Sequence, residues 1–124
     1  MITLRDAHLD AFQKVSLKQF EDRMVEHLRN DFADGTKDRS EPDLRNLVRD
    51  SIAKAKTYGV VAEGDVQRFI DCRMIHGLEF DTAKETNWAG QILRTPSLTG
   101  SGKMDHVEKF GRERVKKSEP ENGR

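Results

Sequence analysis

The stretch that decides the fold runs from Leu44 to Asp81 and reads LRNLVRDSIAKAKTYGVVAEGDVQRFIDCRMIHGLEFD. It contains two runs of apolar residues spaced three or four apart, the pattern of a helix with one buried face. The turn Tyr58-Gly59-Val60 joins them, and a turn this short requires the two helices to pack on each other or on shared neighbours. The first run is Leu44, Leu47, Val48, Ile52 and Ala55, and the second is Val66, Phe69, Ile70 and Met74.

Each of the two runs ends in a glycine followed by an aliphatic residue, first Gly59-Val60 and then Gly77-Leu78. Glycine adopts the left-handed backbone conformation at little cost, and the next apolar residue can fold back onto the helix that the glycine closes. We therefore expect a positive φ at Gly59 and a two-helix nucleus around it.

Helical patterns also precede this nucleus. Thr3 can cap a first helix, and a second apolar stripe occupies residues 17–28. The two stripes point to opposite sides of a continuous helix, so we expect a break near Val15. The stretch 31–40 has no apolar period and is expected to be a loop, with Ser40 capping a helix that runs to about Tyr58.

Shorter helical segments follow the nucleus, and no stretch alternates in the manner of a strand. Leu78 and Phe80 are expected to point inward, and Asp81 or Thr82 to cap a single turn. A short helix is expected over 88–93 and a last helix from about Ser101. The prediction is an all-α, compact single-domain bundle of about five helices over residues 1–110, with a disordered, flexible polar tail over 111–124.

The composition narrows the classes of function. A chain of 124 residues is long enough for one domain, and its 22 Lys and Arg against 22 Asp and Glu argue against a nucleic-acid partner. No apolar run reaches the ~20 residues that span a bilayer, and the N-terminal residues do not have the pattern of a signal peptide. The single Cys72 fits a reducing compartment. We expect a cytoplasmic protein without a membrane partner.

No constellation of side chains predicts catalysis. Cys72 is expected to be a packing residue, and no serine lies in a nucleophile elbow. The histidines are not spaced as metal ligands, so no metal and no cofactor are expected. Five carboxylates between Glu63 and Asp81 form either an acidic binding surface or a solvated helix face in which Arg68 pairs with Asp65 and Asp71. The histidines are His8, His27, His76 and His106.

Arg73 is a charged residue at a position where the helical pattern predicts an apolar one. On the helical wheel it lies in the apolar stripe beside Phe69 and Ile70, where an unpaired guanidinium is too costly to bury. One possibility is that it extends outward from the last helical turn. The other is an ion pair with Glu79, with Asp81 or with a carboxylate of a partner protein.

Ile75 shows the opposite mismatch, because it projects from the polar side of the same helix, with Arg68 and Asp71. Either a later segment such as 88–93 covers it, or it is an exposed contact point. If that side is a surface, Arg68→Glu with Ile75→Asp should leave the fold intact and abolish binding of the partner.

The nucleus and the segment after it resemble a bacterial protein family. The matching residues are Ala55-x-x-Tyr58-Gly59-Val60, Glu63-x-Asp65-Val66-x-Arg68-Phe69-Ile70-Asp71, Gly77-x-x-Phe80-Asp81 and Trp88-Ala89-x-x-Ile92-Leu93. The chain resembles small helical accessory proteins encoded in type VI secretion clusters, beside PAAR or VgrG spike proteins, their adaptors and their toxic effectors. The resemblance covers residues 44–93, with a weaker echo in 17–28. This chain departs from the family at Ala62, where a hydroxyl cap is usual, and at Arg73, where an apolar residue is usual.

The resemblance implies a protein that acts by binding, as a chaperone or co-adaptor whose partner is a secretion effector or its adaptor. An immunity protein that neutralises a cognate toxin is the alternative. A small enzyme or a nucleic-acid-binding regulator ranks below both. The residues expected to contact the partner are Arg68, Asp71, Arg73, Ile75 and Trp88.

Overall fold

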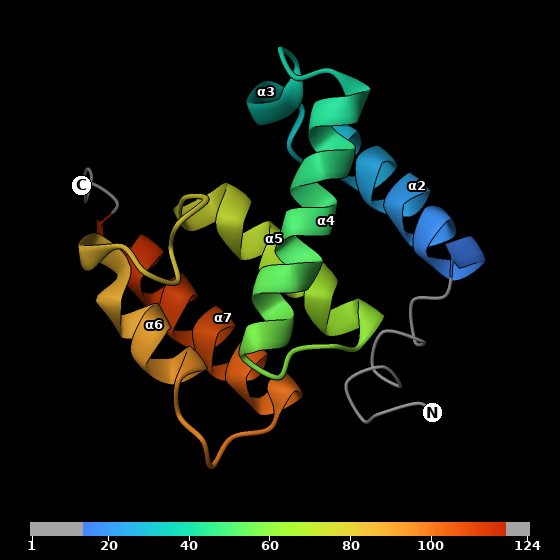
Figure 1. Ribbon diagram of the computed structural model, residues 1–124. Helices are drawn as coiled ribbons and strands as arrows, with labels where there is room; N and C mark the ends of the chain where they lie inside the picture. The colour runs from blue at the N-terminus through green and yellow to red at the C-terminus, as the bar shows by residue number, and fades with distance from the viewer. Residues whose placement is uncertain (1–13, 119–124) are drawn as a thin grey trace, which may run out of the picture.

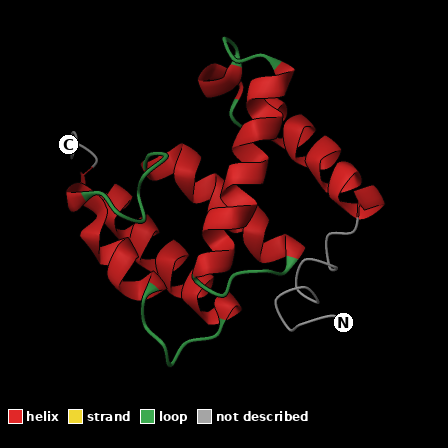
Figure 2. Ribbon diagram, in the orientation of Figure 1, coloured by secondary structure: helices red, strands yellow, loops and turns green. Residues whose placement is uncertain are grey.

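The computed structural model describes residues 14–118, with the backbone alone described at 14, 15 and 115–118. Within this range the chain forms helices and no strands (Figure 2), which confirms the predicted all-α class. The elements are α2 (Lys14–Asp31), α3 (Ala33–Thr36), α4 (Glu41–Thr57), α5 (Glu63–His76), the 3-10 turn η1 (Lys84–Thr86), α6 (Asn87–Leu93) and α7 (Gly100–Ser118).

Helices α4 and α5 lie in the middle of the molecule, and the other helices cover them from two sides (Figure 1). On one side α2 packs against α4 and carries α3, and on the other α7 packs against α5 and carries α6. Their buried side chains form a single core, with members such as Phe20 of α2, Phe69 of α5 and Val107 of α7. The pair of helices predicted from residues 44–81 is therefore the centre of the fold.

Both ends of α4 follow the signals in the sequence. Ser40 Oγ accepts a hydrogen bond of 3.2 Å from a backbone N–H in the first turn, a donor that the helix itself cannot satisfy. At the other end Gly59 has a φ of +78°, its N–H donates to the carbonyl of Lys56, and the N–H of Val60 donates to that of Ala55. These bonds form a Schellman motif in which Val60 is fully buried. The positive φ predicted for Gly59 is confirmed.

Gly59→Val should lower the free energy of unfolding by about 1–2 kcal/mol, because a β-branched L residue is strained at positive φ. Space does not limit this position, since a Cβ built on Gly59 meets nothing within 4 Å. Gly64 offers a matched control with equally open space but without a positive φ. Gly64→Ala should leave stability unchanged or raise it by up to about 1 kcal/mol. Urea denaturation measures both, and equal shifts would contradict the assignment of the cost to backbone conformation.

Helix α5 begins without a side-chain cap, as Ala62 predicts. Ala62 makes no capping hydrogen bond, and Glu63 and Asp65 place negative charge on the first turn, where the helix dipole favours it. Asp65 also accepts a hydrogen bond from Ser101 Oγ at 2.5 Å. The start of α5 is therefore tied to the start of α7, a contact that compensates for the missing cap.

The structure differs from expectation at two places before α4. The backbone is helical from Lys14, the first described residue, to Asp31, so the chain has no break at Val15 or after it within α2. Residues 3–13, which hold the rest of the expected first helix, lie outside the described residues. The expected loop over 31–40 contains the single turn α3, in which the buried Thr36 donates its hydroxyl to the carbonyl of Phe32 at 2.9 Å. One buried threonine holds this turn, so no apolar period marks it in the sequence.

The segment after α5 is partly as predicted. Phe80 is fully buried and Leu78 half-buried, and α6 occupies the predicted short helix. The capping prediction is wrong, because η1 follows Ala83 and has no side-chain cap, and Asp81 is buried instead. Asp81 lies inside the fold, where its carboxylate accepts a hydrogen bond from the hydroxyl of Tyr58.

Helix α7 begins at Gly100, close to the predicted start, and continues to Ser118. The predicted boundary of the tail at residue 111 therefore differs from the structure, in which residues 111–118 are helical, and residues 119–124 lie outside the described residues. The cause is visible at Gly111, where a Cβ would come within 2.8 Å of Nε2 of His76 and 3.4 Å of Trp88. Gly111 therefore allows a close approach between helices. The sequence alone had suggested that the helix ends at this glycine.

The turn after α4 also supports the start of α7. A Cβ at Gly100 would lie 2.5 Å from the carbonyl oxygen of Gly59, so the two backbones touch. Lys103 Nζ donates to the carbonyl of Tyr58 at 2.8 Å. With Asp65 near Ser101 and His76 near Gly111, α5 and α7 run parallel to each other.

Candidate protein-interaction site

Two large apolar side chains are exposed among residues 16–114, whose side chains the structure describes, and Ile75 is the more exposed of them, with 56% of its surface accessible. It lies on α5, whose other side carries Phe69 and Ile70 into the core with no exposure. The segment 88–93 does not cover it, because α6 packs against α7. Of the two alternatives that the sequence left open, the structure shows the exposed one.

Arg68 joins α5 to α7 and is not a free surface residue. It donates to Asp65 at 2.9 Å within its own helix, as the spacing predicted, and to Asp105 at 2.5 Å and Glu108 at 2.9 Å on α7. The hydrogen bond to Glu108 is the largest of the contributions that raise the pKa of Arg68. Reversing its charge is therefore expected to weaken the fold, which corrects the prediction that the fold would be left intact.

Asp71 faces α2 and does not pair with Arg68. Its Oδ1 lies 2.7 Å from Nε2 of His27, and Nδ1 of the same ring lies 3.2 Å from Asp31. Burial raises the pKa of Asp71, and the hydrogen bond to His27 opposes that rise. This contact fixes α2 to α5 one helical turn before Ile75.

Arg73 is buried, with 3% of its surface accessible. Its guanidinium has three partners: Ser51 Oγ at 2.7 Å, the carbonyl of Leu78 at 2.9 Å and Asp50 at 3.0 Å. Extension to the outside and pairing with Glu79 or Asp81 are both wrong, because polar atoms of α4 and of the turn after α5 meet it inside the fold. A buried side chain cannot meet a partner, so the placement of Arg73 on a contact surface is also wrong.

The carboxylates between Glu63 and Asp81 do not form one acidic surface. Their partners come from separate elements: Arg23 for Glu63, Arg68 for Asp65, His27 for Asp71, Lys54 for Glu79, and the hydroxyl of Tyr58, at 2.6 Å, for Asp81. Burial, aided by Asp81, raises the pKa of Tyr58 to about 12, so the phenol stays protonated and donates. These acidic residues tie elements together, and the acidic-surface alternative does not hold.

Trp88 packs on His76, the neighbour of Ile75, and leaves the Ile75 side chain open. The two rings meet edge-on with their centroids 5.4 Å apart. The guanidinium carbon of Arg114 lies 5.2 Å from the centroid of the Trp88 ring, in cation–π geometry. The structure therefore places Trp88 in the contact between α6 and α7 and does not join it to Ile75 in one patch.

Cys72 is buried and has no disulfide partner, in agreement with the predicted packing role. Burial is the main cause that raises its pKa to about 12, so the thiolate does not form near neutral pH. Within residues 14–118, no three side chains of His, Cys, Asp or Glu are placed to hold a metal ion.

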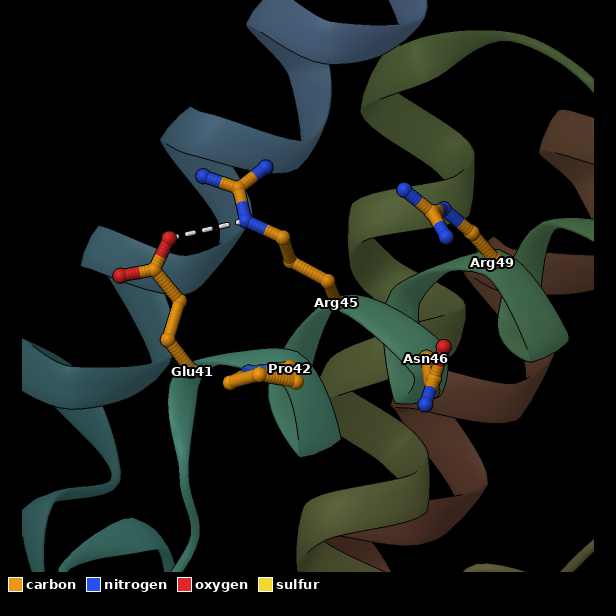
Figure 3. A pocket seen from close by; sticks show the side chains of 5 residues that line it. All are labelled: Glu41, Pro42, Arg45, Asn46 and Arg49. Carbon is orange, nitrogen blue, oxygen red and sulfur yellow. Dashed lines mark hydrogen bonds and ion pairs between the residues drawn. The ribbon is translucent and has the colours of Figure 1, made fainter.

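A hollow lined by arginines lies between α2 and α4, and the sequence did not reveal it. Figure 3 shows Arg45 extending toward α2 with its ion pair to Glu41. Beneath it Glu21, with 2% exposure, accepts hydrogen bonds from Arg49 at 2.7 and 3.2 Å and from Arg45 at 3.3 Å. The residues that line this hollow are Leu17, Lys18, Glu21, Glu41, Arg45 and Arg49. A second hollow shares Glu41, Arg45 and Arg49 and is completed by Pro42 and Asn46, so its lining lies on α4 alone (Figure 3).

The charges of this hollow are satisfied within the chain, so it fastens α2 to α4 and offers no free cation. The hydrogen bond to Asp22 is the largest of the contributions that raise the pKa of Arg45. A signal was present in the sequence, because Glu21 falls on the apolar stripe of residues 17–28. This is the same mismatch that marks Arg73.

No family model, no curated protein and no solved structure matches the chain. Among the helices described in residues 14–118, none combines the length and the apolar character that crossing a bilayer requires. The geometry described above and the resemblance over residues 44–93 are therefore the grounds for a proposal.

His76 should make stability depend on pH. Burial lowers its pKa below the ordinary value of 6.5, so the unfolded chain binds a proton near that pH that the folded chain does not. The stability linked to neutral His76 is complete above about pH 6.5 and is lost as the pH falls through the lowered pKa. We expect the free energy of unfolding to decrease from about pH 7 to about pH 5, and His76→Gln to remove that part of the decrease.

Urea denaturation at several pH values measures the unchanged protein and His76→Gln. Parallel curves for the unchanged protein and for His76→Gln would contradict the assignment.

Proposed function

We propose that this protein is a non-catalytic, protein-binding accessory that serves a type VI secretion effector as chaperone or co-adaptor. The observation that carries the mode of action is the exposed Ile75 on the central helix of the fold, with 56% of its surface accessible. The secretion system and the class of partner come from the resemblance over residues 44–93. Covering the exposed part of the Ile75 side chain against a partner is worth about half of the ~1.5–3 kcal/mol that burial of a whole isoleucine contributes.

The surroundings of Ile75 suit a contact point. Arg68 is held by α7 and Asp71 by α2, so the polar residues on its own side of α5 are fixed before any partner arrives. Little side-chain entropy then remains to be lost on binding. An apolar anchor bordered by ordered polar groups is the arrangement of many interface hot spots.

Ile75→Asp should abolish binding of the effector while the protein stays folded, because a carboxylate at the centre of an interface must be desolvated. Co-expression with a type VI secretion effector from the same genome, followed by co-purification, measures the loss, for which we expect at least a tenfold decrease. Ala53→Asp is the matched control, since Ala53 is an exposed residue on α4. It should retain binding. Undiminished binding by folded Ile75→Asp would exclude this surface.

The same experiment separates the chaperone role from the immunity alternative. A chaperone or co-adaptor raises the soluble yield of the effector and leaves its toxic activity unchanged after release. An immunity protein blocks that activity in the purified complex. Inhibition of the toxin by the unchanged protein, lost in Ile75→Asp, would replace the chaperone proposal with the immunity alternative at the same surface.

A further inference from the structure

The second half of α7 carries exposed side chains that no other helix within residues 14–118 covers. We call this part of the molecule the α7 surface and define it by the residues His106, Lys109, Phe110 and Arg114 of α7 and Trp88 of α6. Phe110 is 39% exposed, its ring centroid lies 6.4 Å from that of His106, and Arg114, one turn later, lies against Trp88. His106, Phe110 and Arg114 follow one another at steps of four residues, so they lie along one side of the helix.

This surface has a net positive charge, because Arg68 of α5 pairs with two carboxylates of α7 and Glu113 is the one acidic residue left beside Lys109 and Arg114. Arg68 takes both Asp105 and Glu108, the acidic residues in the preceding two turns of α7. Beyond them, Lys109 and Arg114 have no carboxylate partner within residues 14–118, and the only acidic residue between them is Glu113. Cations that have no carboxylate partner in the described part of the chain, beside an exposed aromatic ring, favour a ligand with carboxylates next to an apolar side chain.

We infer that the α7 surface binds an acidic amphipathic segment of the partner protein. An apolar residue of that segment would cover Phe110, and its carboxylates would meet Lys109 and Arg114. The inference rests on the proposed function in taking the partner to be a protein, and it adds the chemistry of the segment that is recognised. Its surface lies on α7 and α6, whereas Ile75 lies on α5, so the two contacts can be tested separately.

The observations favour an acidic protein segment over a nucleic acid or an anionic bilayer. A nucleic acid would require a row of cations for successive phosphates, and Glu113 interrupts the row here. A bilayer would require apolar side chains free to insert, whereas Trp88 is held between His76 and Arg114.

The test uses a synthetic peptide as a probe. It has leucines at helical spacing and glutamates at the remaining surface positions, and a second peptide has lysine in place of every glutamate. Fluorescence anisotropy with the full chain at about 50 mM salt, within the low-salt range where surface charges act strongly, measures both. We expect at least tenfold tighter binding of the glutamate peptide. Equal binding of the two peptides would overturn the inference.

Two pairs of substitutions locate the binding. Lys109→Glu with Arg114→Glu should weaken binding of the glutamate peptide at least tenfold, whereas Lys37→Glu with Lys84→Glu, at exposed positions elsewhere, should change it less than twofold. Phe110→Ser, which keeps the charges, should also weaken it. Undiminished binding by the Lys109 and Arg114 variant would overturn the inference.

Other probes and Ile75→Asp complete the test. Tighter binding of phosphatidylglycerol vesicles or of single-stranded DNA than of the glutamate peptide would overturn the choice of a protein segment. Ile75→Asp should bind the glutamate peptide like the unchanged protein. If the peptide result holds and effector binding is absent, the proposed function fails and the α7 surface stands. If the effector binds and the protein does not prefer the glutamate peptide, the proposed function stands and only the inference about the α7 surface fails.

Discussion

Arg73→Leu should lower the free energy of unfolding by about 3 kcal/mol, because it removes a buried donor group that has three partners in the fold. The Ser51 hydroxyl, with no exposure, loses the hydrogen bond that it accepts, and the carbonyl of Leu78 loses its donor. Leucine also leaves unfilled the volume of the guanidinium. Urea denaturation followed by far-UV circular dichroism measures the loss.

The cost should come from the buried acceptors and not from the ion pair. Asp50 keeps 57% of its side chain exposed, so solvent already screens its charge. Asp50→Asn is therefore the matched control, with an expected loss of less than about 1 kcal/mol. A loss in Asp50→Asn as large as that in Arg73→Leu would show that the ion pair is the main contribution.

Arg68→Glu should also destabilise the fold by about 3 kcal/mol, because it places a fourth carboxylate among Asp65, Asp105 and Glu108. The expected consequence is a weakened contact between α5 and α7, with lower protection of the α7 amides in hydrogen exchange. Arg112→Glu, a charge reversal at an exposed position on α7, should change stability by no more than about 0.5 kcal/mol.

A charge swap tests whether the loss comes from electrostatics. Adding Glu108→Arg to Arg68→Glu restores a pair of opposite charges across the two helices and should recover about half of the loss. The double-mutant cycle gives the coupling free energy between positions 68 and 108 directly. A coupling free energy close to zero would mean that packing, and not charge, holds α7 in place.

The sequence is sufficient for the features that depend on neighbours along the chain. The apolar spacing in residues 44–81 predicts both central helices. Ser40 and Gly59 cap α4 as expected, because capping involves only residues within one turn of the helix end. The same reasoning predicts the short helix α6 and the start of α7.

The candidate site was less predictable because its contacts join residues far apart in sequence. Charged residues in an apolar stripe, Arg73 and Glu21, identify positions that need internal partners, but helix packing decides which partner is near. Arg73 meets Asp50 of α4, and Glu21 meets Arg49 of the same helix. Arg68 looked exposed on its own helix, and α7 covers it. Ile75 was the one predicted contact residue whose exposure could be confirmed.

Cys72 can report how often the fold opens, because it is the single cysteine of the chain and is buried. Cys72 lies inside the fold, and the charge of Glu108 on α7 acts on its thiol. A thiol reagent can modify it only in those molecules in which α7 has moved away from α5 or the whole chain has unfolded. The rate of modification under native conditions therefore measures how often this half of the domain opens, without any label being introduced. Binding of a partner to α7 would slow that rate, and weakening the Arg68 contacts would speed it.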